Sequence, residues 1–234
     1  MKVAISQPTF FPWIGYFDII DQVNLFVILD DVNFDYQSWQ HRNNFITAVG
    51  LKKFSIQVVS GKKRNIIKNI KIHDNIFFQK KFEKFIYFNY KNSKYFENYF
   101  EELKKVIKKS LKDSSLLELN FNLICWINKI LGVKTNIKKS SELNLNSKKV
   151  EKIIDICNFF DAREYLTTIG AKEYLYPKEY LFKNHNIKLI YHEYNHPKYN
   201  QNSKKFIKYV SIIDLIFNEG KNSLEIIKSG RKFT

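Results

Sequence analysis

The sequence predicts an α/β protein whose mixed or mostly parallel sheet is flanked by helices, with a helical insertion in the middle of the chain. Three observations lead to this prediction. Short apolar runs make residues 1–74 β-rich, three amphipathic helical patterns follow over 75–132, and helix and strand patterns alternate over 133–234. No Pro-, Gly- or Ser-rich linker separates these parts, so we expect residues 1–234 to form a single compact unit.

The β-rich part opens with a strand, a helix and a second strand. The strand spans Lys2–Ser6 and the helix Pro12–Val23, and the continuous apolar run Leu25–Leu29 predicts a strand that is buried on both faces. Further along, the pattern predicts two hairpin strands around Gly50, a basic turn and one more strand: Phe45–Val49, Lys53–Val59, Gly61–Arg64 and Ile66–Ile72.

The middle and C-terminal parts show helical spacing with recognisable ends. Three apolar stripes predict core-facing helices: Phe78, Phe82, Phe85 and Ile86; Phe96, Tyr99, Phe100, Leu103 and Ile107; and Leu116, Leu123, Ile124, Ile127 and Leu131. Ser115 with Glu118 resembles a capping box, and Gly132 is a natural C-terminal stop. Downstream we expect a helix, two strands and a last helix: Ser147–Phe160, Glu164–Thr168, Ile187–Tyr191 and Phe206–Phe217.

The net charge of +16 over 234 residues admits two interpretations. It suits an anionic partner such as a nucleotide, a nucleic acid or an anionic membrane surface. It also fits the Ile-, Lys-, Asn- and Phe-rich composition that an AT-rich genome gives without selection for binding. Pairs such as Lys104–Lys105 and Lys108–Lys109 fall on the polar side of a helix, and arginine, the usual reader of polyanions, is scarce.

Two cysteines and the absence of an apolar run point to the cytoplasm. Cys125 and Cys157 lie inside helical apolar patterns, which predicts buried free thiols and a reducing compartment. Gln7 and Pro8 interrupt any signal-peptide core, and no stretch approaches the ~18–20 apolar residues of a membrane span.

The segment from Ser6 to Phe17 joins a buried strand to a helix. Ligands of open α/β sheets bind at such carboxyl ends of strands. Gln7 and Pro8 stand in the loop, and a helix that starts at Pro12 has free N–H groups for a phosphate or carboxylate. Trp13 and Tyr16 are candidates to stack on a base or sugar. The structural alternative is a rigid corner with a packed tryptophan.

Two acidic residues end the second strand, and a polar segment follows them. Asp30 and Asp31 are candidates for a Mg²⁺ site or a general base, and strand geometry directs only one of them at a site. Downstream come Trp39, Arg42 and Asn43. The planar Arg42 guanidinium can bind two oxygens of a carboxylate or phosphate at once. His41 is a further possible base, although a lone histidine is more often structural.

Two later segments complete the candidate site. Thr168, Gly170 and Lys172 follow a strand and supply a hydroxyl, a permissive backbone and an ammonium group for an anion. His192 and His196 alternate to one face of an extended segment that continues to Tyr199. No third ligand stands near them, so we expect no metal site and favour His196 as a hydrogen-bonding or catalytic residue.

Together these segments resemble the WbqC-like protein family. Its N-terminal motifs match Ile5–Pro8, Pro12–Phe17, Leu29–Phe34 and Trp39–Asn43. Its C-terminal motifs match Gly170–Leu175 with one extra residue, His196–Tyr199 and Ser211–Gly220. One position departs from the pattern, because Ser6 stands where family members usually have a histidine.

The resemblance implies a bacterial transferase of O-antigen or lipopolysaccharide biosynthesis that acts on a nucleotide-linked amino sugar. The reaction it implies is N-acyl or aminoacyl transfer to the sugar amine. The acyl donor is unknown, possibly an aminoacyl-tRNA, and no cofactor is expected. We expect His196 or Asp31 to act as the base and Gln7, Arg42 and Asn43 to orient substrate or hold the oxyanion. The predicted substrate-binding residues are Gln7, Pro8, Trp13, Tyr16, Asp30, Trp39, Arg42, Asn43, Thr168, Gly170, Lys172, His192 and Tyr199.

Two other functions remain open. The charge favours a nucleic-acid-binding, tRNA-handling protein, while the lack of any known RNA-binding motif speaks against it. A non-catalytic component of a polysaccharide assembly would not need polar motifs at strand ends. If there is one active site, Gln7, Arg42 and His196 should converge in one pocket.

Overall fold

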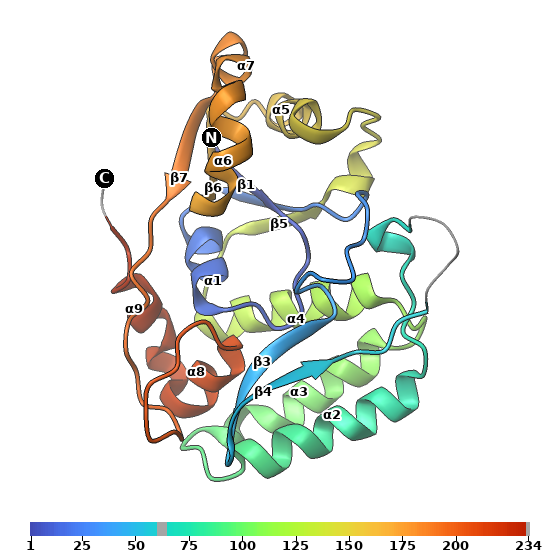
Figure 1. Ribbon diagram of the computed structural model, residues 1–234, viewed down its shortest axis with the longest axis vertical. Coiled ribbons are helices and arrows are strands. Elements are labelled where there is room, and N and C mark those ends of the chain that lie inside the picture. Colours follow the sequence, from blue (N-terminus) through green and yellow to red (C-terminus); the bar gives the residue numbers. More distant parts are fainter. Residues whose placement is uncertain (60–64, 233–234) are drawn as a thin grey trace.

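The centre of the molecule is a five-stranded sheet in the order β5-β2-β1-β6-β7, and every neighbouring pair is parallel. The computed structural model describes residues 1–59 and 65–232 (Figure 1). The strands are β1 (Lys2–Ser6), β2 (Leu25–Ile28), β5 (Asn136–Lys139), β6 (Glu164–Thr168) and β7 (Lys188–His192). The α/β prediction with a parallel sheet is therefore confirmed.

Helices and short 3-10 turns surround the sheet. The helices are α1 (Ile14–Asp21), α2 (Asn75–Tyr90), α3 (Phe96–Ser110), α4 (Leu116–Leu131), α5 (Lys149–Phe159), α6 (Lys172–Leu175), α7 (Glu179–Asn184), α8 (Ile212–Glu219) and α9 (Ser223–Lys228). The turns are η1 (Ile67–Asn69), η2 (Ser140–Leu143), η3 (Ile169–Ala171), η4 (Tyr176–Lys178) and η5 (Gly220–Asn222). The ends predicted for α4 are confirmed: Ser115 Oγ accepts the Glu118 N–H at 3.3 Å, and Gly132 has φ 73°.

Alternating side chains of the central strands build two separate cores, one on each face of the sheet. Val3 and Ile5 of β1 pack with residues of α5 and α7, whereas Ala4 packs in the core that contains α1 and α4. In β2 all four residues are buried, so the prediction of a strand covered on both faces is confirmed. Burial of this kind fixes the register, because a shift of one residue would exchange the two faces.

A two-stranded antiparallel hairpin, β3 (Arg42–Thr47) with β4 (Gly50–Ser55), lies apart from the main sheet and packs on the helical part. Figure 1 shows it running across α2, α3 and α4. Its apolar side joins a cluster of phenylalanine rings, in which the centroids of Phe54 and Phe82 are 4.9 Å apart and those of Phe10 and Phe82 5.4 Å apart. This ring packing attaches the loop after β1 to the helices 70 residues downstream.

Two predicted elements differ in the structure. The strand expected over Ile66–Ile72 is wrong: Ile67–Asn69 forms η1, because the buried side chains of Ile67 and Ile70 are three residues apart and suit a 3-10 turn. The last long helix begins at Ile212 and not at Phe206, since Ser211 caps it and Tyr209 has φ 61°. The basic turn expected over Gly61–Arg64 lies outside the described residues.

Within 1–59 and 65–232, no helix has the length and apolar character that a membrane crossing requires.

Candidate functional site

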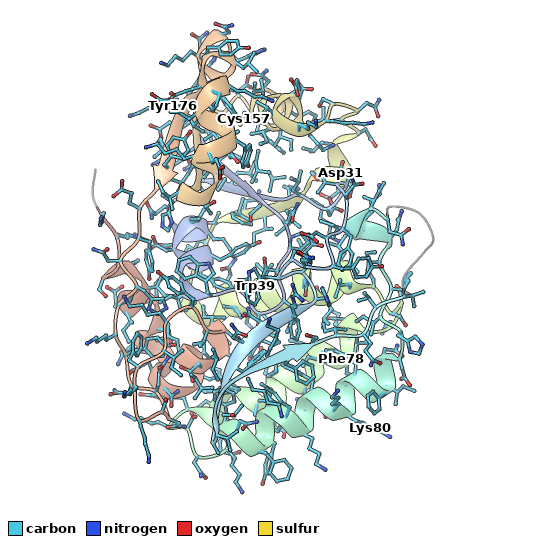
Figure 2. All side chains as sticks on the ribbon, in the orientation of Figure 1. Asp31, Trp39, Phe78, Lys80, Cys157 and Tyr176 are labelled. Carbon is cyan, nitrogen blue, oxygen red and sulfur yellow. The ribbon has the colours of Figure 1, made fainter. Side chains whose placement is uncertain are left out.

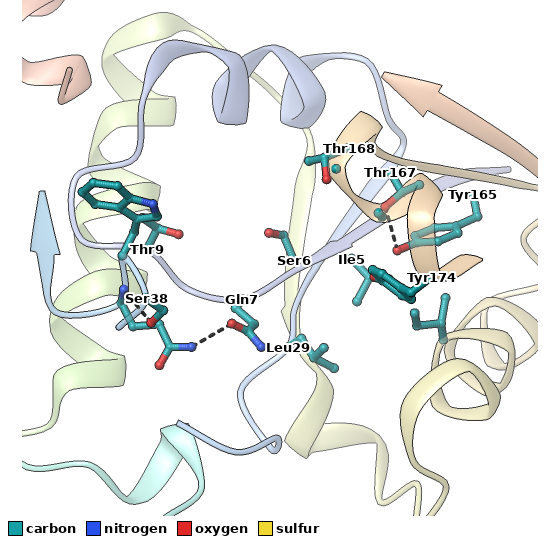
Figure 3. A pocket seen from close by; sticks show the side chains of 15 residues that line it. Ile5, Ser6, Gln7, Thr9, Leu29, Ser38, Tyr165, Thr167, Thr168 and Tyr174 are labelled. Carbon is teal, nitrogen blue, oxygen red and sulfur yellow. Dashed lines mark hydrogen bonds between the residues drawn. The ribbon is translucent and has the colours of Figure 1, made fainter. Parts of the chain in front are cut away.

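A cavity of about 380 Å³ opens at the carboxyl ends of β1 and β6. From β1 the chain continues through α1 to β2 on one side, whereas α5 later returns it to β6 on the other side of β1. This reversal of strand order leaves a crevice between the two connections, and open α/β sheets bind their ligands there. We call this the strand-edge cavity (Figure 3).

The cavity is lined by neutral side chains. Its lining residues are Ile5, Ser6, Gln7, Thr9, Leu29, Ser38, Trp39, Gln40, Ile153, Tyr165, Thr167, Thr168, Gly170, Ala171 and Tyr174. None of these described residues is acidic or basic, and five carry aliphatic hydroxyls. In Figure 3, Ser6 and Gln7 lie between Ser38 on one side and Thr167, Tyr165 and Tyr174 on the other. Such a surface offers many hydrogen bonds without a fixed charge.

Two lining residues of the cavity, Gln7 and Gln40, are hydrogen-bonded to each other. Gln40 Nε2 donates to Gln7 Oε1 at 2.7 Å, which orients both amides (Figure 3). Asn120 of α4 is fully buried, and its Nδ2 donates to the Gln40 carbonyl at 2.7 Å. The loop after β1, the segment before β3 and the helical part are thus tied together beneath the cavity, so Gln7 is held before any ligand arrives.

The loop from Pro8 to Trp13 is held rigidly. Asn43 Nδ2 donates to the carbonyls of Phe10 at 2.9 Å and Phe11 at 2.6 Å, and Phe11 has φ 45°, a conformation that non-glycine residues adopt only when neighbours enforce it. Asn43 and Pro8 are buried and are not among the lining residues of the cavity, and Asn43 acts on the site by holding this loop.

The two aromatic residues expected to stack on a ligand pack within the protein. A Cβ at Gly15 would overlap the Trp13 ring, so only glycine lets the ring cover the first turn of α1. Tyr16 is buried, and its hydroxyl donates to the Gln7 carbonyl at 3.2 Å. Burial raises the pKa of Tyr16 well above its ordinary value.

The exposed rings at the cavity are Trp39 and Tyr174. Trp39 was predicted, and its side chain is 47% exposed; Tyr174 was not predicted, and is 55% exposed. Lys53 Nζ lies 5.7 Å from the Trp39 ring centroid. Arg42 supports this loop, because its Nε donates to the Ser38 carbonyl at 3.1 Å and its Nη2 donates to the Gln37 carbonyl. Arg42 thus positions the segment that carries Trp39.

Asp30 and Asp31 are both fully engaged at the end of β2. Asp30 accepts the Ser141 N–H at 2.9 Å and the Ser141 hydroxyl at 2.6 Å. Asp31 pairs with Lys152 of α5 at 2.7 Å, and Ser140 Oγ lies 2.6 Å from its other oxygen. These contacts join β2 to η2 and α5. Asp31 stands two residues beyond Leu29, which lines the cavity.

The histidine segment contributes no lining residue to the strand-edge cavity, although His192 pairs with the lining residue Thr168 in the sheet. His192 Nε2 is 2.7 Å from Asp18 Oδ2, and Arg231 Nε donates to the other oxygen of the same fully buried carboxylate at 2.6 Å. This network joins the end of β7, α1 and residues near the C-terminal end of the described chain. His192 therefore has a structural partner.

His196 stands in an aromatic cluster with Trp13, Tyr199, Phe206 and Tyr209. Its ring is stacked 6.1 Å from that of Trp13, and burial lowers its pKa. Its Nε2 is buried without a hydrogen-bond partner among the described residues. The predicted convergence of Gln7, Arg42 and His196 is therefore incomplete, because neither Arg42 nor His196 is a lining residue of the cavity that contains Gln7.

The segment after β6 reaches the cavity in part. Thr168 and Gly170 line it as expected, whereas Lys172 Nζ points to the Tyr191 ring, 5.7 Å from its centroid. The predicted site residues do not include the lining residues Ser6, Thr9, Ser38, Gln40, Tyr165, Thr167 and Tyr174. For Ser6 and Thr167 the signal was available, since Ser6 ends one predicted strand and Thr167 is the next-to-last residue of another. Across the described ranges, no three His, Cys, Asp or Glu side chains are grouped to hold a metal ion.

Comparison with known proteins agrees with the motifs. The model of the WbqC-like protein family matches residues 7–226 of the chain. An uncharacterised protein of Mycobacterium tuberculosis, Rv1507c, is 30% identical over 233 residues, which covers 99% of this chain and 99% of that protein. No solved structure matches. The matched range contains both connections that frame the strand-edge cavity, and the chain therefore belongs to the WbqC-like protein family.

Proposed function

We propose that this protein is a cytoplasmic transferase that binds a nucleotide-linked amino sugar in the strand-edge cavity and acylates the sugar amine, in bacterial O-antigen or lipopolysaccharide biosynthesis. The observation that carries the proposal is the neutral lining of hydroxyls and amides at the point where the strand order reverses. Sugars present hydroxyls that both donate and accept, and Ser, Thr and Gln side chains match them in both roles.

Size and exposure support the same class of ligand. The cavity volume of about 380 Å³ accommodates a monosaccharide and is near the lower end of known ligand sites. Tyr174 offers an exposed ring on which a nucleobase can stack, and Trp39 lies at the same cavity with Lys53 beside its ring. The diphosphate would then lie toward solvent, where the +16 net charge favours an anion.

The reaction needs a base and an oxyanion site. The lone pair of the sugar amine attacks the acyl carbonyl carbon, the amine proton passes to a base, and the tetrahedral intermediate expels the donor group, which takes up a proton on departure. Of the two predicted bases, Asp31 is nearer in sequence to a lining residue and is paired with Lys152. His196 stays a prediction that a His196→Gln variant tests. The Gln7 amide and the Thr168 hydroxyl are our candidates to stabilise the oxyanion.

Blocking the cavity tests the proposal directly. Gly170 has open space around it, since a Cβ there would meet nothing closer than Thr168 Oγ1 at 3.9 Å. Gly170→Phe should fill the cavity and weaken binding of uridine- and thymidine-diphosphate amino sugars, measured by calorimetry, by at least about tenfold. The matched control is Ile169→Phe, which enlarges a half-exposed neighbour that is not a lining residue. Equal affinity in Gly170→Phe and wild type would exclude this cavity as the site.

A second experiment distinguishes the proposed transferase from a tRNA-binding protein, the alternative that the net charge favours. Binding of tRNA should fall steeply with salt because many counterions are released, whereas a nucleotide sugar with two phosphates should respond mildly. If only tRNA binds, with a steep salt dependence and no effect of Gly170→Phe, the protein is a nucleic-acid binder and the transferase proposal is wrong.

A further inference from the structure

The outward side of α2 exposes large apolar side chains and lysines together. Its exposed apolar residues are Ile76, Phe77, Tyr87 and Phe88, between 44% and 66% exposed. Its exposed lysines are Lys80, Lys81 and Lys84, and Lys91 follows at the helix end. We call these eight residues the α2 face. In Figure 2, Lys80 lies at the lower edge of the molecule.

This face is not needed for the core. Four other side chains of α2 are buried against the protein, namely Phe78, Phe82, Ile86 and Tyr90. The helix therefore has apolar side chains on two sides. One side is buried against the protein, and the other is exposed. The carboxylate of α2, Glu83, is half-buried and accepts the Gln79 amide at 2.8 Å. The α2 face thus combines apolar area with a strong positive charge.

The β3–β4 hairpin, whose tip lies near the C-terminal end of α2, carries exposed side chains of the same kind. Tyr90 Oη, at the end of α2, accepts the Ile46 N–H at 3.1 Å, which sets the hairpin beside this helix end. At the tip, Val49 is 93% exposed and Leu51 is half exposed. Lys52 follows, and it is exposed. Helix α2 and the β3–β4 hairpin are separate in sequence, but both present exposed apolar side chains next to lysine ammonium groups.

The ring geometry decides between the anionic partners that such a face can bind. Lys81 Nζ stands 5.6 Å from the Phe77 ring centroid, Lys84 Nζ 5.8 Å from that of Phe88, and Lys91 Nζ 5.6 Å from that of Tyr87. Nucleobases stack on free ring faces, and here lysines already cover one face of each ring. A bilayer instead takes the apolar tips into its headgroup boundary and leaves the ammonium groups at the level of the lipid phosphates.

We propose that the α2 face and the hairpin tip dock this protein peripherally on an anionic phospholipid bilayer. The neighbouring α3 provides the contrast. It also carries four lysines, but Glu97, Glu101 and Glu102 accompany them and none of its large apolar side chains is exposed. A solvated helix surface has the composition of α3, whereas a bilayer-binding surface has that of α2. The inference stands apart from the proposed function, since no residue of the α2 face lines the strand-edge cavity.

Co-sedimentation with vesicles tests the proposal. The full-length protein should bind vesicles of equal phosphatidylglycerol and phosphatidylcholine at least about tenfold more tightly than pure phosphatidylcholine vesicles. Each lysine near an anionic surface contributes a factor of about five, so Lys80→Gln with Lys84→Gln should weaken binding about 25-fold. Phe77→Ser with Phe88→Ser should also weaken it at least about tenfold, because the buried apolar area is lost.

The matched control is Lys105→Gln with Lys108→Gln on α3, which removes the same charge from the other helix and should change binding less than about twofold. Circular dichroism and amino-sugar binding report whether each variant is folded. Phe88→Trp gives a second readout, since brominated lipid should quench the added tryptophan. No preference for anionic vesicles, or an equal loss in the α3 control, would overturn the proposal. So would α2-dependent binding of tRNA without vesicle binding, which would assign the face to nucleic acid.

Discussion

The polar residues around the central sheet fall into two sets that differ in their partners. Asp18, Asp30 and Asp31 are buried or nearly buried, and each carboxylate is bound by serine hydroxyls or by a cationic or histidine side chain. The cavity residues at β1 and β6 are neutral, and several hydroxyls face open space. Residue types that suggest catalysis in a sequence therefore hold this fold together, and the least conspicuous polar residues form the cavity.

The largest effect should come from the most completely paired charge. Asp18→Ala leaves His192 without its carboxylate partner and Arg231 with Asp21 alone, and loss of one partner of a buried ion pair costs up to about 3–5 kcal/mol. Urea unfolding should show this loss, with amino-sugar affinity unchanged where the variant is folded. Glu164→Gln is the control, because its ion pair with Lys2 is partly exposed and should be worth less than about 1 kcal/mol. Similar losses in both variants would contradict the contrast between paired and open sites.

Asp31 tests whether a paired carboxylate can also be catalytic. Asp31→Asn should destabilise the protein by about 3 kcal/mol, since Lys152 is buried and loses its partner. Replacing Lys152 with Met in the same chain should recover most of that stability, because no buried charge is left unpaired. If Asp31 is the base, acyl transfer stays lost by about 10²-fold or more in the stabilised double variant. Recovery of turnover together with stability would make Asp31 purely structural.

Asp214 is the exception among the buried carboxylates, because neither oxygen has a well-formed hydrogen bond among the described residues. Burial raises the pKa of Asp214 to about 7, and the nearby Tyr199 and Gln201 only partly offset this. The folded protein thus keeps a proton that the unfolded chain releases near pH 3.8. The protonated Asp214 carboxyl therefore contributes fully to the free energy of unfolding below about pH 4. This contribution is lost as the pH rises toward 7, and the loss between pH 5 and 7 is about 2–3 kcal/mol. Asp214→Asn should flatten this slope in unfolding measurements, and an unchanged slope would assign it to other groups.

The smallest effect concerns the two cysteines, of which Cys157 is buried in the core on the α5 side of the sheet and Cys125 is partly exposed. Burial raises the pKa of Cys157 to about 12, so about one thiol in ten thousand is ionised at pH 8. The pKa of Cys125 is also raised by burial, but its side chain is partly exposed. A thiol reagent should therefore label both slowly without denaturant, Cys157 more slowly than Cys125, and both faster as the pH rises. Fast labelling of Cys157 would show that the α5 side of the sheet opens readily.

Most of the fold was predictable because it rests on local patterns. Apolar runs and helical stripes predicted β1, β2, β6, β7 and the three helices α2–α4 to within a few residues. Strand β5 was not predicted, because Asn136–Lys139 lacks an apolar run. It is an edge strand, and half of its residues are exposed. The segment before Ile212 was read as helix since its apolar spacing is helical, although Ser211 interrupts it.

The candidate site was less predictable because its composition is ordinary. Gln7, Trp39, Thr168 and Gly170 were predicted from strand ends and motifs, and all four line the cavity. Gln40 and Tyr174 were not, since nothing local distinguishes a glutamine or tyrosine that faces a cavity from one that faces solvent. Their placement depends on strand order, which brings residue 7 beside residue 168, and no local pattern encodes that order.

The central position of β1 has a consequence for how the chain is made. Its partner β2 is synthesised within about 30 residues, but its other neighbour, β6, begins only at Glu164. During synthesis one edge of β1 therefore stays unpaired until more than half of the chain has been made. The helical segments between β1 and β6 can already pack on the β3–β4 hairpin in that time. The cavity cannot exist until β1 has paired with β6. A ribosome-bound chain that ends before Glu164 should therefore be aggregation-prone and unable to bind ligand. Once residues 164–234 have also been synthesised and released, the chain should gain solubility and ligand binding at the same time.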